Sequence, residues 1–89
     1  MGIRLDGDVV IITGGGGAIG GAQARLFASS GASVVVADID RVKAEAVAAE
    51  VRSSGGSAIG CALDVRDASA WGAVVNAAEA AFGPVTALA

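Results

Sequence analysis

Side chains that carry chemistry are scarce in this chain of 89 residues, which has no tyrosine, no histidine and a single lysine. The sequence therefore indicates more about what the protein binds than about any reaction, and we predict no catalytic residue and no metal site. The one cysteine, Cys61, cannot form an internal disulfide, which favours a reducing, cytoplasmic setting. Nothing near Cys61 suggests an activated thiolate, so we predict a small buried residue there.

Long apolar runs and basic clusters are also lacking. No stretch approaches the roughly 20 apolar residues that a membrane-spanning helix needs, and Asp6 stands where the apolar core of a secretory signal would begin. Six basic residues face nine acidic ones, for a net charge of −3, and they form no cluster. Neither a membrane nor a nucleic acid is therefore expected as a partner.

Short apolar segments alternate along the chain with segments of helical periodicity. Strands are predicted over residues 8–13, 33–38 and 57–64, with the start of a fourth at 85–89, and helices over residues 18–30, 41–54 and 68–82. This alternation is typical of βαβ units and hence of a parallel sheet. The predicted fold class is α/β, a doubly wound parallel sheet that is cut after its first half.

The predicted helices carry apolar faces and recognisable ends. In the first helix the residues expected near one face are Ile19, Ala22 or Gln23, Leu26 and Phe27; in the third they are Trp71 (a core anchor), Val74, Val75, Ala78 and Phe82. Asp40 and Asp67 precede the second and third helices and are predicted to cap them rather than to bind a ligand. Gly31 is predicted to end the first helix.

Two predicted strands are continuously apolar, at residues 9–12 and 34–37, which is typical of strands buried on both faces. Right-handed crossovers place the first two helices on one face of the sheet and leave only the third for the other. One face is then under-covered, and the strand beside the first is missing or ragged. We therefore expect residues 1–89 to form a partial domain that tends to self-associate. A compact domain that dimerises over this face is the alternative.

A run of four glycines, Gly14 to Gly17, joins the first predicted strand to the first helix. Glycines let the backbone approach a pyrophosphate, and a helix start offers free N–H groups and partial positive charge. The run fits G-x-G-x-x-G from position 15, G-x-x-G-x-x-G from position 14, and T-G-x-x-x-[AG]-x-G from Thr13, so its register stays open. A tight turn without a ligand is the alternative. A P-loop is excluded, because Gly20 is not followed by lysine and serine or threonine.

Acidic residues at two predicted strand ends extend this pattern. Asp38 lies 18 residues after Gly20, where a carboxylate is expected to hold the ribose hydroxyls of NAD. A carboxylate there repels the 2′-phosphate of NADP, and no lysine or arginine occupies position 17 or 39, so NAD is the predicted cofactor. Asp64 could accept a hydrogen bond from the adenine amino group, and Val65 could pack on the ring. Simple turn residues are the alternative at these positions.

Five segments of the chain share their spacing with one family: Leu5-Asp6-Gly7-Asp8-Val9, Thr13 to Gly20, Ala37-Asp38, Leu63-Asp64-Val65-Arg66-Asp67 and Phe82-Gly83-Pro84-Val85. Together they resemble the amino-terminal part of the short-chain dehydrogenase/reductase family, over essentially the whole chain. The resemblance implies a Rossmann-type fold and a set of NAD-binding residues. These are Gly14, Gly16, Gly17 and Ile19 along the pyrophosphate and nicotinamide side, with Gly20 in the same motif, Asp38 at the adenosine ribose, and Asp64 and Val65 at adenine.

The resemblance also implies hydride transfer between an alcohol or carbonyl substrate and NAD. The family's Asn-Asn-Ala-Gly segment and its catalytic serine, tyrosine and lysine are expected beyond residue 89, and Lys43, in the second predicted helix, does not match that lysine. We therefore expect the NAD-binding portion of an oxidoreductase, inactive by itself. Two alternatives stay open: a stand-alone NAD-binding regulatory module, and a structural fragment without a ligand.

Overall fold

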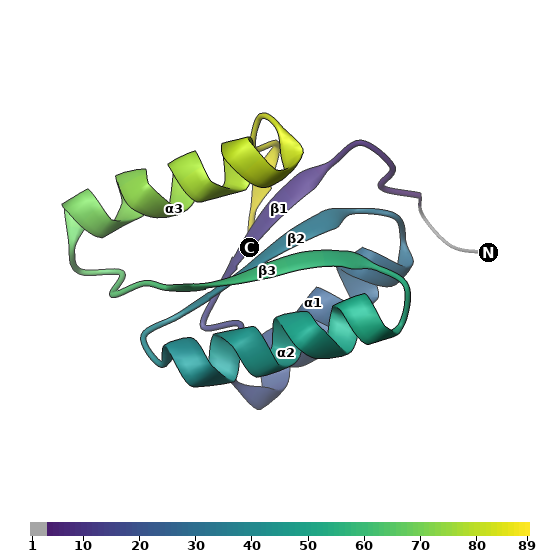
Figure 1. Cartoon of the computed structure of the whole chain (residues 1–89), viewed down its shortest axis with the longest axis horizontal. Helices are drawn as coiled ribbons and strands as arrows, with labels where there is room; N and C mark the ends of the chain where they lie inside the picture. Colours follow the sequence, from purple (N-terminus) through teal and green to yellow (C-terminus); the bar gives the residue numbers. More distant parts are fainter. Residues whose placement is uncertain (1–3) are drawn as a thin grey trace.

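Four parallel strands form a single sheet in the computed structural model, which describes residues 4–89. The chain runs β1 (Val9–Thr13), α1 (Ala18–Ser29), β2 (Ser33–Asp38), α2 (Arg41–Ser53), β3 (Ser57–Ala62), α3 (Ala68–Phe82) and β4 (Ala87–Leu88). The strand order across the sheet is β3-β2-β1-β4 (Figure 1). The predicted α/β class and its parallel, Rossmann-type sheet are thus confirmed.

The register of the sheet brings the carboxyl ends of its three longer strands to one edge. β1 pairs with β2 from Val9↔Ser33 to Thr13↔Ala37, and β2 pairs with β3 as far as Asp38↔Ala62. The turns that follow β1, β2 and β3 therefore lie beside one another. The fourth strand is shorter than predicted, because only Ala87 and Leu88 pair with β1.

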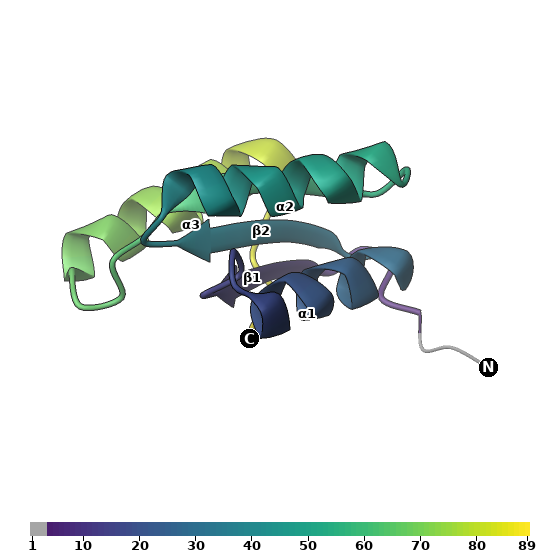
Figure 2. The same cartoon turned by 90° about the horizontal axis from the view of Figure 1, so that it is seen from below.

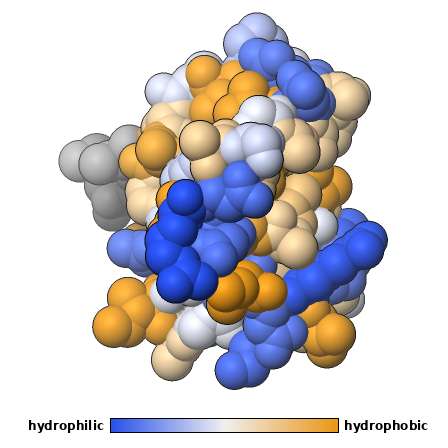
Figure 3. Space-filling view, turned by 90° about the vertical axis from the view of Figure 1, so that its left-hand side faces the viewer, coloured by the Kyte–Doolittle hydropathy of each residue, from blue (hydrophilic) through white to orange (hydrophobic). Residues whose placement is uncertain are grey.

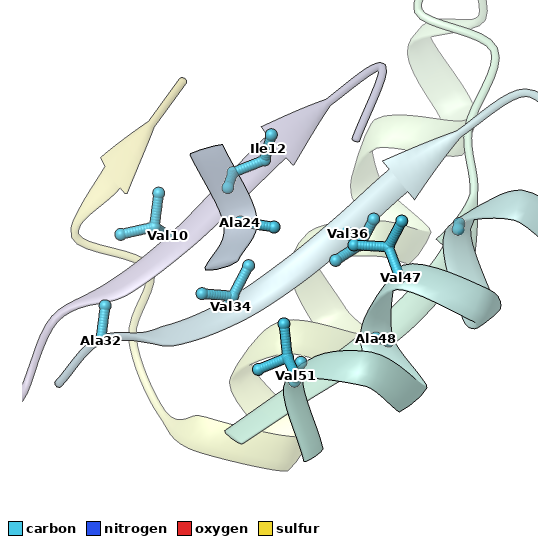
Figure 4. Packing of buried hydrophobic residues seen from close by; sticks show 11 residues of the cluster. Val10, Ile12, Ala24, Ala32, Val34, Val36, Val47, Ala48 and Val51 are labelled. Atoms are coloured by element: carbon cyan, nitrogen blue, oxygen red, sulfur yellow. The ribbon is translucent and has the colours of Figure 1, made fainter. Parts of the chain in front are cut away.

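Helices cover the sheet as right-handed crossovers require, with α1 and α2 on one face and α3 on the other (Figures 1 and 2). Alternate residues of the central strands point to opposite faces. Val10, Ile12, Val34 and Val36 pack against Ala24 of α1 and against Ala48 and Val51 of α2 (Figure 4). On the other side, Val9, Ile11, Val35 and Ala37 pack against Val74 and Ala78 of α3. The continuous apolar runs are explained by burial on both faces.

The predicted apolar face of α1 is wrong. Its buried residues are Gly20, Gly21 and Ala24, whereas Ile19 is 79% and Leu26 64% exposed. Ala22 and Gln23 are exposed as well, and only Phe27 is partly buried. Small residues face the sheet because α1 lies so close to the turn after β1 that a side chain at Gly20 would strike the backbone of that turn.

The predicted face of α3 is confirmed. All five of its residues belong to one apolar cluster, although Trp71 is only half-buried and lies at the margin of that cluster rather than at its centre. The central strands are fully covered on this side, whereas Ile59 and Cys61 of β3 stay half-buried. The under-covering expected for this face is therefore confined to the edge of the sheet.

Helix ends follow the local sequence signals. The Asp40 carboxylate accepts hydrogen bonds from the backbone N–H groups of Val42 and Lys43, and the Asp67 carboxylate accepts one from Ser69 N–H. Both acids are therefore caps, as predicted. Gly31, at φ +103°, ends α1 with bonds from Gly31 N–H to Ala28 O and from Ala32 N–H to Phe27 O, the pattern of a Schellman motif. Within residues 4–89 no helix is long and apolar enough to cross a bilayer.

Candidate functional site

The glycine run forms a tight turn between the end of β1 and the start of α1. Gly14 turns the chain at φ +65°, a conformation that side chains disfavour. Gly15 N–H then donates to Ala37 O at 3.1 Å, and Gly17 N–H donates to Gly14 O at 3.1 Å. The turn is thereby tied both to β2 and to itself, and it delivers Gly17 as the N-cap of α1.

The glycines of this run have different physical reasons to be glycine. A Cβ at Gly15 would lie 2.7 Å from Val36 Cγ1, and one at Gly16 would lie 2.7 Å from Lys43 Cβ. The protein itself therefore leaves no room for a side chain at these two positions. A Cβ at Gly17 would meet nothing closer than Gly14 O at 3.5 Å, an ordinary contact. The fold therefore does not require glycine at position 17. A ligand that approaches the backbone closely at this position would require it.

The amino terminus of α1 is open. The first helical hydrogen bond runs from Gly21 N–H to Gly17 O at 2.8 Å, so the N–H groups of residues 18–20 precede the helical ladder. Within the described residues no side chain caps this helix, in contrast to α2 and α3, which Asp40 and Asp67 cap. Gly17, Ala18 and Ile19 are exposed. Free donors and the helix dipole make this end suited to an anion such as a pyrophosphate.

Asp38 lies at the end of β2, next to the glycine turn. Its Oδ2 accepts a hydrogen bond from Gly16 N–H at 3.1 Å, and its Oδ1 accepts one from Asp40 N–H at 2.9 Å. These bonds hold the carboxylate at the carboxyl edge of the sheet while leaving it partly exposed. Each oxygen keeps acceptor capacity, since an ionised carboxylate offers about four lone-pair sites. The carboxylate can therefore accept hydrogen bonds from hydroxyl groups while it keeps its bonds to the backbone N–H groups of Gly16 and Asp40.

The segment after β3 carries a second carboxylate at the same edge. Asp64 Oδ1 accepts from Arg66 Nε at 3.0 Å, and Asp64 Oδ2 accepts from Arg66 Nη2 at 2.9 Å. These side-chain bonds, together with one from Arg66 N–H, lower the pKa of the Asp64 carboxyl below its usual value. Asp64 is thus ionised at neutral pH and acts only as an acceptor.

A cleft of about 370 Å³ lies at these two strand ends. It is lined by Gly14, Asp38, Ile39 and residues 63–66. Figure 3 looks onto this edge of the molecule and shows hydrophilic and hydrophobic side chains interspersed over it. The volume suits part of a small ligand, and the apolar residues beside two carboxylates suit a flat base and its sugar.

A larger hollow of about 440 Å³ lies elsewhere, among residues such as Arg25, Ser29 and Gly55 near the carboxyl ends of α1 and α2. Helix carboxyl ends present carbonyl oxygens and partial negative charge. This hollow contains none of the predicted site residues. The smaller cleft at the edge of the sheet is therefore the better candidate for a phosphorylated ligand.

The structure brings the predicted site residues to one edge but gives them different settings. Gly14, Asp38, Asp64 and Val65 line the cleft, Gly16 bonds to Asp38, and Gly17, Ile19 and Gly20 lie at the start of α1. Three cleft residues were not predicted, namely Ile39, Leu63 and Arg66. The available signal was their position, since each adjoins or closely follows an acid at a strand end.

Cys61 takes no part in this site. It lies in β3 and is half-buried rather than fully buried. Burial is the main cause that raises the pKa of its thiol above the usual value. A raised pKa leaves little thiolate at neutral pH, which agrees with the absence of activating signals in the sequence.

The family model and the individual relatives that match this chain point to the same family. The family model for short chain dehydrogenases matches residues 8–89. The 2,5-dichloro-2,5-cyclohexadiene-1,4-diol dehydrogenase of Sphingobium indicum is 47% identical over 88 residues, which cover 99% of this chain and 35% of that protein. The 7α-hydroxysteroid dehydrogenase of Escherichia coli is 41% identical over 86 residues, which cover 97% of this chain and 34% of that protein.

Comparison with solved structures gives the same family as the comparison of sequences. A 7α-hydroxysteroid dehydrogenase in complex with NADH and 7-oxo glycochenodeoxycholic acid superposes with a TM-score of 0.91 at 41% identity, over 96% of this chain and 33% of that one. The chain thus spans about a third of the length of the curated relatives it matches. The predicted resemblance to the amino-terminal part of a larger dehydrogenase is confirmed.

Proposed function

The chain belongs to the short-chain dehydrogenase family, and we propose that it is the NAD-binding portion of an oxidoreductase of this family. Residues 1–89 then form a partial dinucleotide-binding domain. The whole enzyme would transfer hydride between an alcohol or carbonyl group and the nicotinamide ring, which is the chemistry that the cofactor supplies when bound. The residues described above would bind and orient that cofactor.

The observation that carries this proposal is the meeting of an open helix amino terminus and a carboxylate-lined cleft at one edge of the sheet. The start of α1 has no capping side chain among residues 4–89, and Ala18 and Ile19 there are exposed, while the cleft is lined by Gly14, Asp38 and the Asp64–Arg66 segment. In parallel α/β sheets ligands bind at the carboxyl ends of the strands. A dinucleotide requires both an anion site and a site for a base and ribose, and the features of this edge are suited to both.

The proposed contacts follow the order of the cofactor's parts. Gly14, Gly16, Gly17, Ile19 and Gly20 would line the pyrophosphate and the nicotinamide side, with the free N–H groups of α1 as donors. Asp38 would accept from the adenosine ribose hydroxyls. Asp64 would accept from the adenine amino group, and Val65, which is 56% exposed, would pack on the ring.

We propose that NAD is preferred over NADP. Asp38 would place a negative charge where NADP carries its 2′-phosphate, and two like charges at such short range repel strongly. Ile39, the residue that follows, is apolar, so no positive charge at that position offsets the repulsion.

Replacing Gly17 with alanine tests the cofactor site separately from the fold. We expect the NAD affinity to fall by tenfold or more, roughly the cost of one displaced charge-assisted hydrogen bond, because a methyl group would occupy the space along which a pyrophosphate approaches. The free energy of unfolding should change by less than about 1 kcal/mol, since the new Cβ meets only Gly14 O at 3.5 Å. Calorimetric titration with NAD and urea denaturation measure the two quantities.

Gly72→Ala is the matched control. It lies within α3, and a Cβ there meets nothing within 4 Å, so this variant should bind NAD like the wild type. Unchanged NAD binding by a folded Gly17→Ala variant would contradict the proposed pyrophosphate site. Absence of NAD binding by the folded wild-type chain would contradict the proposed function of these 89 residues taken alone.

We also propose that the isolated chain is catalytically inactive and self-associates. Leu88, on the short edge strand β4, is 63% exposed, and Ile19 and Leu26 are exposed apolar residues on α1. Sedimentation velocity should reveal species heavier than the 8.5 kDa monomer, and Leu26→Gln should reduce them, because it removes apolar surface without disturbing the core. A wild-type chain that sediments only as a monomer and binds little hydrophobic dye would contradict this.

A further inference from the structure

Asp64 has a role in the cofactor contacts proposed above, whereas Arg66, which pairs with it, has none. Arg66 approaches Asp64 as a fork, with Nε at 3.0 Å from Oδ1 and Nη2 at 2.9 Å from Oδ2, and its backbone N–H donates to Oδ1 at 3.0 Å. Both residues line the cleft. A bidentate arginine–carboxylate pair fixes direction as well as charge.

The backbone that carries this pair is held at several points. Leu63 N–H donates to Asp38 O at 2.8 Å, and Asp67 N–H donates to Asp64 O at 2.9 Å. The indole Nε1 of Trp71 donates to Val65 O at 3.2 Å. The peptide units are therefore ordered before any ligand arrives, and the remaining freedom of the Asp64 carboxylate is rotation about its own side-chain bonds.

Arg66 restricts that freedom. An ionised carboxylate accepts at about four lone-pair sites, and Arg66 occupies three, two of them on Oδ1 and one on Oδ2. One acceptor direction is left, on Oδ2. The Arg66 side chain itself is 81% exposed, whereas that of Asp64 is 36% exposed, so the arginine lies on the solvent side of the carboxylate.

We propose that Arg66 is a positioning residue that aims the free lone pair of Asp64 at the base, so that the cleft accepts a 6-amino purine and rejects a 6-oxo purine. This inference rests on the proposed function, because it assigns a specificity to the adenine end of the same site. A purine with an amino group at C6 donates to the aimed oxygen. A purine with a carbonyl at C6 brings an acceptor against an acceptor, and neither is satisfied. The carboxylate does not convert to a donor, because its pairing with Arg66 lowers its pKa.

The test compares NAD with nicotinamide hypoxanthine dinucleotide, which differ at C6 of the purine. Binding is followed by the NMR signal of the indole N–H of Trp71, the single tryptophan of the chain, which adjoins the cleft through Val65. We expect the wild-type chain to prefer NAD by about tenfold or more, the usual effect of one hydrogen bond to a charged group. In Arg66→Met the ratio of the two affinities should fall to less than about threefold, since the freed carboxylate rotates and is hydrated.

Two further variants make the test specific. Arg66→Lys keeps the positive charge but lacks the planar fork, so it should not restore the preference. Arg25→Met removes another exposed arginine, which pairs with Glu50 at 3.0 Å away from the cleft, and it should keep the wild-type ratio.

Each outcome decides between the proposals. A ratio that falls in both Arg66 variants and persists in Arg25→Met supports the inference. Equal losses of affinity for both dinucleotides in Arg66→Met would mean that Arg66 only stacks on the base, and they overturn the inference. A wild-type ratio of affinities in Arg66→Lys overturns it as well. Equal binding of both dinucleotides by the wild type overturns the inference but leaves cofactor binding intact. Binding of neither dinucleotide overturns the inference together with the proposed function.

Discussion

Asp38→Ala should reverse the cofactor preference of the chain. We expect the affinity for NAD to fall roughly 10- to 100-fold, because hydrogen bonds to a charged group contribute about 1.5–3 kcal/mol. The affinity for NADP should fall much less than that for NAD, or rise, because the carboxylate that repels the 2′-phosphate is gone. Arg41 and Lys43 begin α2 just beyond this position, so the variant leaves two positive charges near the vacated site.

The ratio of the two affinities is the decisive quantity, because Asp38 also has a structural role. Its carboxylate accepts from Gly16 N–H and Asp40 N–H, so its loss loosens the turn and weakens both cofactors alike. Calorimetric titrations with NAD and NADP separate the two effects. Asp40→Ala is the matched control, since it removes a neighbouring carboxylate that caps α2, and it should leave the ratio close to that of the wild type. A parallel loss of NAD and NADP binding in Asp38→Ala would refute the ribose assignment.

Gly20→Ala should be among the most destabilising single substitutions in the chain. A Cβ at this position would lie within 3 Å of three backbone atoms of the glycine turn, the nearest being Gly14 O. Backbone cannot move aside as the end of a flexible side chain can, so α1 must shift away from the sheet. We expect a loss of about 3 kcal/mol in the free energy of unfolding, a large part of the roughly 4–13 kcal/mol usual for a chain of this size. Urea denaturation followed by circular dichroism measures it.

Its neighbour supplies the control. A Cβ at Gly21 would meet Arg25 Nη1 at 3.4 Å and Val47 Cγ2 at 3.5 Å, both ordinary contacts with side chains. Gly21→Ala should therefore stabilise the chain by about 0.5–1 kcal/mol, the usual gain of alanine over glycine inside a helix. Similar stability changes in the two variants would show that the close approach of α1 to the turn is not what requires glycine at position 20.

Features that depend on interactions between residues close in the sequence were predicted accurately, and features that depend on contacts between distant segments were not. Asp40 and Asp67 were identified as caps because a cap bonds to N–H groups two or three residues away. β3 was predicted to reach residue 64 but ends at Ala62, because pairing stops where its neighbour β2 ends at Asp38. The apolar pattern continues past that point, and only the partner strand sets the limit.

The same distinction applies to the candidate site. Asp38 was predicted as a site residue from its spacing after the glycines and Asp64 from its place after a strand, and the structure brings both to one cleft because the carboxyl ends of parallel strands meet at one edge. Arg66 belonged to a recognised segment but received no role, since its fork onto Asp64 depends on how the chain turns after β3. The register of the glycine run could not be resolved, because consecutive glycines fit several templates equally well.

The sequence by itself determined the order of strands and helices, the parallel sheet, the helix caps and the family, because these depend on local periodicity and on fixed spacings along the chain. Only the tertiary structure decided which side of α1 meets the sheet. The same structure decided that backbone atoms leave no room for a side chain at Gly20, whereas a Cβ fits at Gly17. It also decided that Arg66 holds Asp64. These features depend on distances between segments far apart in the chain or on the conformation of a turn, and neither is encoded in the periodicity of a single segment.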